Sequence, residues 1–123
     1  MAKKILIVED DEFLRTLLAD KLRAGKYEVA EAETGEKALD IISDFNPDLI
    51  LLDLLLPGIH GFDVLEWVKG QSEPLSATPV IILSNLGNQD DIKKGFDLGA
   101  KDYLVKAKFT INEINEKINS VLA

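Results

Sequence analysis

The sequence predicts an α/β domain in which a doubly wound, five-stranded parallel sheet carries helices on both faces. Short apolar runs recur along the chain, and the segments between them place apolar residues at the spacing of an amphipathic helix. The runs are continuous rather than alternating, which is typical of strands buried on both faces. Strand and helix alternate five times, and this order favours a parallel sheet covered on both sides.

Each element has its own signal. Strands are expected at the apolar runs 5–8, 49–52, 80–83 and 103–105, and at the weaker segment 28–32. Helical spacing of apolar residues is found within 14–22, 38–42, 64–68 and 111–121. Gly25 and Gly99 stand where helices would end, Asn88 is a plausible N-cap, and Thr110 with Glu113 forms a capping-box pattern.

Length and composition indicate one globular domain over residues 1–123. The chain is 46% hydrophobic and 29% charged, without a linker or a low-complexity tract. It has no cysteine, which excludes disulfides and thiolate metal sites and is compatible with the expected cytoplasmic location. No apolar run is long enough to cross a membrane. A net charge of −8 would repel phosphate backbones, so direct nucleic-acid binding is not expected.

Polar side chains follow four of the expected strands. Glu9 and Asp10 follow the first, Asp53 the third, Ser84 the fourth and Lys106 the last. The carboxyl ends of parallel strands meet at one edge of the sheet, where doubly wound domains collect their functional groups. Carboxylates gathered there would repel one another unless a cation intervenes, and oxygen ligands without cysteine or paired histidines suit Mg²⁺. A lysine facing them would bind an anion carried by the metal.

This pattern resembles the receiver domains of two-component response regulators over essentially the whole chain. The family has an acidic pair after its first strand, an aspartate ending the third, Ser or Thr ending the fourth and Lys ending the fifth. Those places are filled by Glu9-Asp10, Asp53, Ser84 and Lys106. The loop after Asp53 and the approach to the last strand are also similar. The resemblance implies a flavodoxin-like fold and the function of a single-domain, chemotaxis-regulator-like phosphorelay switch.

By this resemblance, Asp53 is the nucleophile that accepts a phosphoryl group, and Mg²⁺ is the cofactor. The group would come from the phosphohistidine of a sensor histidine kinase or of a histidine phosphotransfer protein. Asp10 and Asp53 would bind the ion directly, Glu9 through water and Leu55 through its backbone carbonyl. The chain would catalyse its own phosphorylation and dephosphorylation rather than act as an enzyme on a separate substrate.

The same resemblance gives roles to the residues around the phosphoryl group. Lys106 and the hydroxyl of Ser84 would contact phosphoryl oxygens. Tyr103 resembles the switch residue, expected to turn inward as Ser84 moves toward the phosphate. The output face would be the fourth helix, last strand and last helix, which would bind a downstream protein target and is a candidate surface for a homodimer. Leucines at positions 55 and 86 predict slow loss of the phosphoryl group.

Three other functions compete with this one. A pseudo-receiver would keep the fold as an interaction module and use no phosphate. A phosphatase of the haloacid dehalogenase type needs a second aspartate two residues after its nucleophile, where this chain has Leu55. A flavin-binding protein of the flavodoxin kind needs a Ser/Thr/Gly phosphate loop after the first strand, where this chain has acidic residues.

Two positions carry further expectations. The family usually has a cis proline after its lysine, whereas Ala107 follows Lys106 here. A cis bond to a non-proline residue costs about 2.5 to 4 kcal/mol, so a trans bond and a rerouted loop are expected. His60 is the only histidine and stands between Pro and Gly residues without partners for a metal or a triad, so we expect it to be solvent-exposed and without function.

Overall fold

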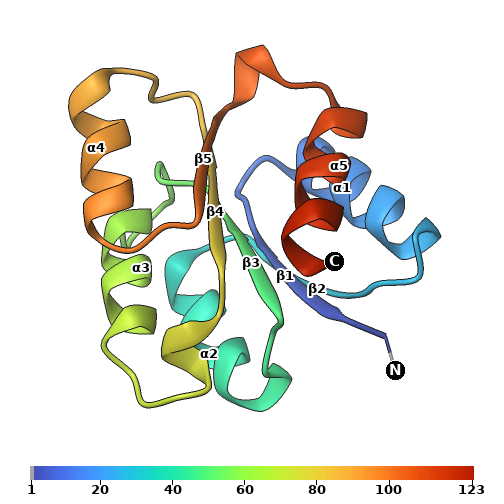
Figure 1. Cartoon of the computed structure of the whole chain (residues 1–123), viewed down its shortest axis with the longest axis horizontal. Helices are drawn as coiled ribbons and strands as arrows, with labels where there is room; N and C mark the ends of the chain where they lie inside the picture. The colour runs from blue at the N-terminus through green and yellow to red at the C-terminus, as the bar shows by residue number, and fades with distance from the viewer. Residues whose placement is uncertain (1) are drawn as a thin grey trace.

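The computed structural model describes residues 2–123 and contains one five-stranded parallel sheet in the order β2-β1-β3-β4-β5 (Figure 1). The strands are β1 (Lys4–Val8), β2 (Glu28–Ala32), β3 (Leu49–Leu52), β4 (Val80–Ser84) and β5 (Asp102–Val105). The helices are α1 (Glu12–Ala24), α2 (Gly35–Phe45), α3 (Gly61–Lys69), α4 (Gln89–Asp97) and α5 (Ile111–Leu122). Two short 3₁₀ turns, η1 (Leu75–Ala77) and η2 (Lys106–Lys108), complete the order. The predicted fold class is confirmed.

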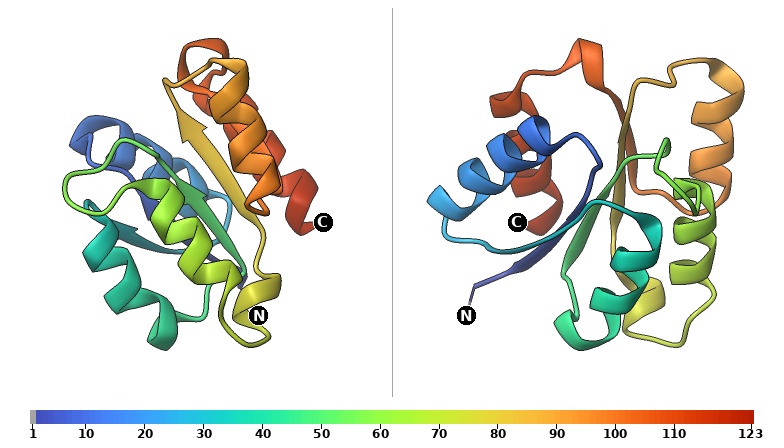
Figure 2. Two further views of the ribbon diagram at one scale, coloured as in Figure 1. Left: turned by 90° about the vertical axis from the view of Figure 1, so that its left-hand side faces the viewer. Right: turned by 180° about the vertical axis from the view of Figure 1, so that it is seen from behind.

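Helices cover both faces of the sheet: α1 and α5 lie on one side, and α2, α3 and α4 on the other (Figure 2). Successive residues of each strand point to opposite faces, so each strand serves two separate apolar clusters. In β1, Ile5 and Ile7 pack under α1 and α5, whereas Leu6 and Val8 pack under the other three helices. This two-sided burial explains why the strand sequences are continuously apolar.

The sheet register brings two strand ends together at the point where the strand order reverses. Val8, the last residue of β1, lies opposite Ala32 of β2 and Leu52 of β3. The amide of Asp53 donates to the Val8 carbonyl at 2.9 Å, and the amide of Glu9 donates to the Ala32 carbonyl at 2.9 Å. The residues that follow β1 and β3 are therefore neighbours at the carboxyl edge of the sheet.

Local signals in the sequence set most helix ends. Asn88 caps α4 by accepting from the Asp91 amide, and Thr110 with Glu113 forms the predicted capping box of α5. Gly25 caps the end of α1. Gly99 stands one residue beyond the C-cap of α4, where its φ of +104° suits glycine.

The expectation that His60 is solvent-exposed is wrong. This residue is the N-cap of α3, and its Nδ1 accepts a hydrogen bond from the Phe62 amide at 3.0 Å. Its ring also stacks on the Phe62 ring with the centroids 5.1 Å apart, so the side chain is half-buried. Neutral histidine has an acceptor nitrogen that can do the work of the usual Asp or Ser cap.

The chain leaves β5 through a trans peptide bond after the lysine. Glu73–Pro74 is the only cis peptide bond in residues 2–123, so Lys106–Ala107 is trans, as predicted. The segment after β5 forms η2 and then enters α5. Among the described helices, none has the length and apolar character needed to cross a membrane.

Candidate functional site

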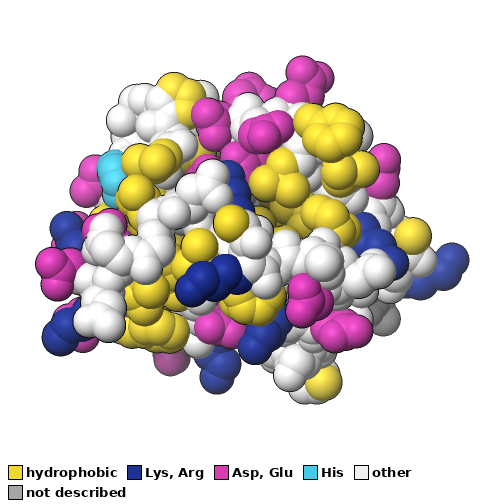
Figure 3. All heavy atoms as spheres, turned by 90° about the horizontal axis from the view of Figure 1, so that it is seen from above, with side chains coloured by type: hydrophobic (Ala, Val, Ile, Leu, Met, Phe, Trp, Pro, Cys, Tyr) yellow, Lys and Arg dark blue, Asp and Glu magenta, His cyan; other side chains and the backbone are white. Residues whose placement is uncertain are grey.

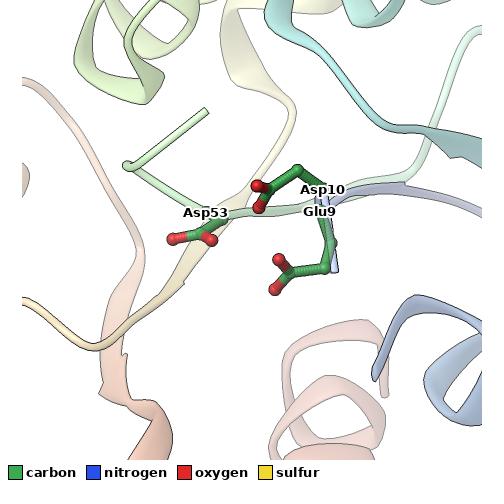
Figure 4. A group of neighbouring side chains, drawn as sticks. All are labelled: Glu9, Asp10 and Asp53. Carbon is green, nitrogen blue, oxygen red and sulfur yellow. The ribbon is translucent and has the colours of Figure 1, made fainter. Parts of the chain in front are cut away.

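Three carboxylates converge at the carboxyl edge of the sheet. Glu9 and Asp10 follow β1, Asp53 follows β3, and one oxygen from each lies within 4.8 Å of the others (Figure 4). Glu9 and Asp53 are only 2% and 5% exposed, whereas Asp10 is open to solvent. Seen from above, acidic side chains lie next to a basic one, with hydrophobic side chains on either side (Figure 3). The predicted acidic site is therefore assembled by the fold.

Lys106 bridges the two buried carboxylates. Its Nζ lies 2.7 Å from Oε1 of Glu9 and 2.9 Å from Oδ2 of Asp53, and only 17% of its side chain is exposed. Burial opposes the charged form of Lys106, but its contacts with Glu9 and Asp53 outweigh burial and raise its pKa. One ammonium thus pairs with two of the three carboxylates, which leaves an excess of negative charge at this edge.

The surroundings of Glu9 disfavour the charged form of its carboxylate. Burial raises its pKa to about 7, and the charge of Asp53 adds to this effect, while the contact with Lys106 opposes it. Its Oε1 is an ion-pair partner of Lys106 but has no hydrogen bond of good geometry within residues 2–123. A buried carboxylate oxygen whose one partner is an ammonium, next to two other carboxylates, fits a hard cation such as Mg²⁺.

The loop after β3 fixes the direction of the Asp53 side chain. Its Oδ1 accepts hydrogen bonds from the amides of Leu54 at 2.7 Å and Leu55 at 3.4 Å, while Oδ2 faces Lys106. Gly61 closes the loop by donating to the Leu54 carbonyl at 2.9 Å. A side chain at Gly61 would collide with the Asp53 carbonyl oxygen, so glycine is required there. The predicted metal contact of the Leu55 carbonyl stays a prediction.

Ser84 and Tyr103 both hold the same residue of the loop between β4 and α4. Ser84 is fully buried, and its Oγ accepts from the Leu86 amide at 3.3 Å. The hydroxyl of Tyr103 donates to the Leu86 carbonyl. Burial raises the pKa of Tyr103 to about 12, with smaller contributions from acidic neighbours, so the hydroxyl keeps its donor proton at neutral pH.

Tyr103 already points inward in this structure, although the resemblance to receiver domains predicts that it turns inward as Ser84 moves toward a phosphate. The side chain is 8% exposed and packs against α4. A Cβ at Gly95 would lie 3.0 Å from the Tyr103 ring and 2.8 Å from Ile82, so glycine makes room for the ring. The Leu86 carbonyl then gives the buried hydroxyl an acceptor.

Two residues near the site, Arg15 and Asp11, have roles that the sequence did not predict. Arg15 donates from Nη1 to the Glu9 carbonyl at 2.9 Å. A charged residue beside the apolar stripe of α1 is the only sequence signal that points to it. Asp11, the third acidic residue after β1, is the N-cap of α1 and accepts from the Leu14 amide at 3.1 Å. Its side chain therefore caps the helix, while its backbone amide donates to Oε2 of Glu9 at 3.1 Å.

Comparisons with known proteins agree with this geometry. The sequence model for the response regulator receiver domain matches residues 5–119. The phosphate regulon transcriptional regulatory protein PhoB of Pseudomonas aeruginosa is 37% identical over 122 residues, which cover 99% of this chain and 52% of PhoB. The chain spans about half the length of the curated relatives it matches.

Solved structures are similar over almost their full length. The chemotaxis response regulator CheY4 of Vibrio cholerae superposes with a TM-score of 0.90 at 27% identity, covering 98% of this chain and 99% of CheY4. The Mn²⁺-bound form of response regulator Rcp1 has a TM-score of 0.79 at 29% identity, covering 93% of this chain and 88% of Rcp1. With its acidic edge, its strand-end serine and lysine and this near-complete match, the chain belongs to the response-regulator receiver domains.

Proposed function

We propose that residues 1–123 act as one receiver unit in which Asp53 accepts a phosphoryl group and thereby changes a protein-binding face. The observation that carries this proposal is the setting of Asp53. Its carboxylate is nearly buried, its Oδ1 is held by the Leu54 amide, and its Oδ2 faces the Lys106 ammonium beside two further carboxylates. This is a fixed nucleophile with a cation ready to meet an incoming anion.

Mg²⁺ fits the acidic cluster as the cofactor. Asp10 and Asp53 would hold it directly, Glu9 through water and Leu55 through its backbone carbonyl. The ion would supply charge neutralisation on the transferring phosphoryl group. The donor set of buried and exposed carboxylate oxygens supports this assignment, as does the Mn²⁺-bound form known for Rcp1.

The transfer step uses groups that already lie at the edge of the sheet. A carboxylate oxygen of Asp53 attacks phosphorus and forms the P–O bond, while the P–N bond to the donor histidine breaks and its electron pair stays on the imidazole. Lys106 then pairs with a phosphoryl oxygen instead of with the carboxylate alone. The hydroxyl of Ser84 turns from the Leu86 amide and donates to another phosphoryl oxygen.

The change in the protein-binding face would start at Leu86, which hydrogen-bonds to both Ser84 and Tyr103. Movement of Ser84 breaks its hydrogen bond with the Leu86 amide, while the hydroxyl of Tyr103 on β5 keeps its bond to the Leu86 carbonyl. The change reaches the face formed by α4, β5 and α5, where Phe96 is 46% exposed and Lys93 pairs with Asp97. This face would bind a downstream protein or a second copy of the chain. The phosphoryl donor would be a sensor histidine kinase or a histidine phosphotransfer protein.

Mass spectrometry after treatment with acetyl phosphate and Mg²⁺ tests the proposal. The parent should gain the mass of one phosphoryl group, and Asp53→Asn should gain none, because an amide is a poor nucleophile. Asp40→Asn, at an exposed position of α2, is the matched control and should be labelled like the parent. Equal labelling of Asp53→Asn would refute the site, and an unlabelled parent would favour the phosphate-independent pseudo-receiver.

A further inference from the structure

Arg15 lies near the start of α1 and reaches back to Glu9, the first residue after β1. Its Nη1 donates to the Glu9 backbone carbonyl at 2.9 Å, and its Nε lies 3.3 Å from Oε1 of Glu31 on β2. Only 13% of the Arg15 side chain is exposed. Because a guanidinium is planar and rigid, partners on two of its nitrogens fix both its position and its orientation.

The hydrogen bond from Arg15 to the Glu9 carbonyl lies just beyond the end of β1, where the hydrogen bonds to the neighbouring strands end. The Glu9 amide still donates to Ala32 on β2. Asp10, the next residue, is exposed and makes no hydrogen bond within the part of the chain that the structure describes. The Glu9 carbonyl belongs to the peptide that leads into Asp10. Arg15 therefore orients that peptide and, through it, the Asp10 carboxylate.

Glu31 gives the positive charge of Arg15 an acidic partner outside the metal cluster. It lies opposite Ile7 in the sheet register, and its two carboxylate oxygens face Arg15 at 3.3 Å and Arg23 at 3.2 Å. Without this carboxylate, the guanidinium would be free to pair with the side chains of Glu9 or Asp10. An arginine placed there would compete with a metal ion for the same oxygens.

We propose that Arg15 and Glu31 are positioning residues for the magnesium site. Arg15 orients the Glu9–Asp10 peptide, and Glu31 holds Arg15 away from the acidic side chains. The inference rests on the proposed function, because it takes the acidic pair to be the metal ligands. Neither residue contacts the reacting atoms, so both act through Glu9. Removing a residue that hydrogen-bonds to a metal ligand typically weakens metal binding by 10- to 100-fold.

Calorimetric titration of the metal-free chain with Mg²⁺ tests the inference, with thermal unfolding in chelator as a check on the fold. Arg15→Gln should weaken Mg²⁺ binding about tenfold. Glu31→Gln should also weaken it, and Arg15→Lys should recover only part of the loss, because one ammonium cannot span both partners. Arg23→Gln is the matched control, since it removes the other partner of Glu31 and leaves the Arg15 contacts in place. It should change the affinity less than twofold.

Phosphoryl uptake from acetyl phosphate gives a second readout. Raising the Mg²⁺ concentration should return Arg15→Gln to the uptake rate of the parent, because the substitution changes the affinity for the ion and not the reacting groups. A folded Arg15→Gln with the Mg²⁺ affinity of the parent would overturn the inference, as would equal weakening by Arg23→Gln. If Arg15→Gln does not fold, Arg15→Lys and Glu31→Gln decide in the same way. A parent that binds Mg²⁺ but takes up no phosphoryl group contradicts the proposed function alone, and the Mg²⁺ affinities still decide the role of Arg15.

Discussion

Two partly buried lysines stand at opposite ends of the sheet, and they differ in the groups they face. At the carboxyl end, Lys106 meets two carboxylates at 2.7 and 2.9 Å. At the amino end, Lys69 donates to the backbone carbonyls of Thr78 at 2.8 Å and Ser76 at 3.3 Å, and it has no ion-pair partner in residues 2–123. Burial disfavours the charged form of both. The carboxylates outweigh burial and raise the pKa of Lys106, whereas burial lowers the pKa of Lys69.

Because their partners differ, the contacts of Lys106 can be replaced by other ions, whereas those of Lys69 are permanent. Two backbone carbonyls accept hydrogen bonds from Lys69 but leave its charge uncompensated, and its stem packs over Gly99. The partners of Lys106 carry charge, so a metal ion can take the place of the ammonium and a phosphoryl group can take the place of the carboxylates. The contacts of Lys69 at the amino end of the sheet therefore stay fixed, whereas those of Lys106 at the carboxyl end can be exchanged for a metal ion or a phosphoryl group.

The largest change in the free energy of unfolding is expected from replacing Lys106. Lys106→Met leaves the buried carboxylates of Glu9 and Asp53 without a cation, and breaking a buried pair in this way costs on the order of 3 kcal/mol. The loss should appear in urea unfolding at pH 8 without metal, and saturating Mg²⁺ should restore part of it. Lys108→Met, at an exposed position, is the control. Equal losses for the two variants would contradict the comparison.

This expectation departs from what strand position alone suggests. A lysine at the end of an edge strand would normally be exposed, and its loss would then impair signalling more than folding. The 17% exposure of the Lys106 side chain and its two ion pairs reverse that expectation for the metal-free protein.

The raised pKa of Glu9 should be visible in how the free energy of unfolding depends on pH. The pKa of Glu9 is raised to about 7 in the folded chain from 4.5, so between these values the folded state binds more protons than the unfolded state. Its contribution to stability is complete below pH 4.5 and is lost as the pH rises through about 7. Urea unfolding in chelator should therefore give a shallower fall in the unfolding free energy for Glu9→Gln than for the parent over this window. Parallel curves would show that Glu9 does not titrate there.

The leucines near Asp53 and Ser84 should slow the loss of the phosphoryl group. Leu55 is 52% exposed and Leu86 is partly buried, and neither can orient an attacking water by hydrogen bonding. Asn at position 55 together with Glu at position 86 should speed acyl-phosphate decay on the order of tenfold, because water positioning is restored. Decay in Mg²⁺ can be followed by intact-protein mass. Unchanged decay would mean that these side chains only pack on their loops.

The smallest effect is expected at the amino end. Lys69→Met removes two hydrogen bonds to carbonyls and should cost about 1 kcal/mol of unfolding free energy. Mg²⁺ affinity and phosphoryl uptake should stay within twofold of the parent, because no exchangeable contact is lost. Unfolding and calorimetry on the same preparation check both statements. A clear change in Mg²⁺ affinity would show that the two ends of the sheet are coupled.

Most of the fold was predictable because its signals are local. The strand 28–32 and the strand 49–52 have the predicted bounds, and the caps at Asn88 and Thr110 are contacts between residues three apart. Side-chain type and spacing fix such features within one segment. The set of strand-end residues was also predictable, because parallel strands must end at the same edge.

The sequence by itself therefore determined the order of strands and helices and the polar groups delivered to the carboxyl edge. Only the tertiary structure decided how those groups meet. The ion pair between Lys106 and Asp53 joins residues 53 positions apart, and the burial of Lys106 depends on how β5 lies beside β4. Arg15 reaches Glu9 and Glu31 only because α1 packs across β1 and β2, and Tyr103 turns inward only because α4 presents Gly95 to its ring. These contacts follow from the packing of distant segments, and no local pattern encodes that packing.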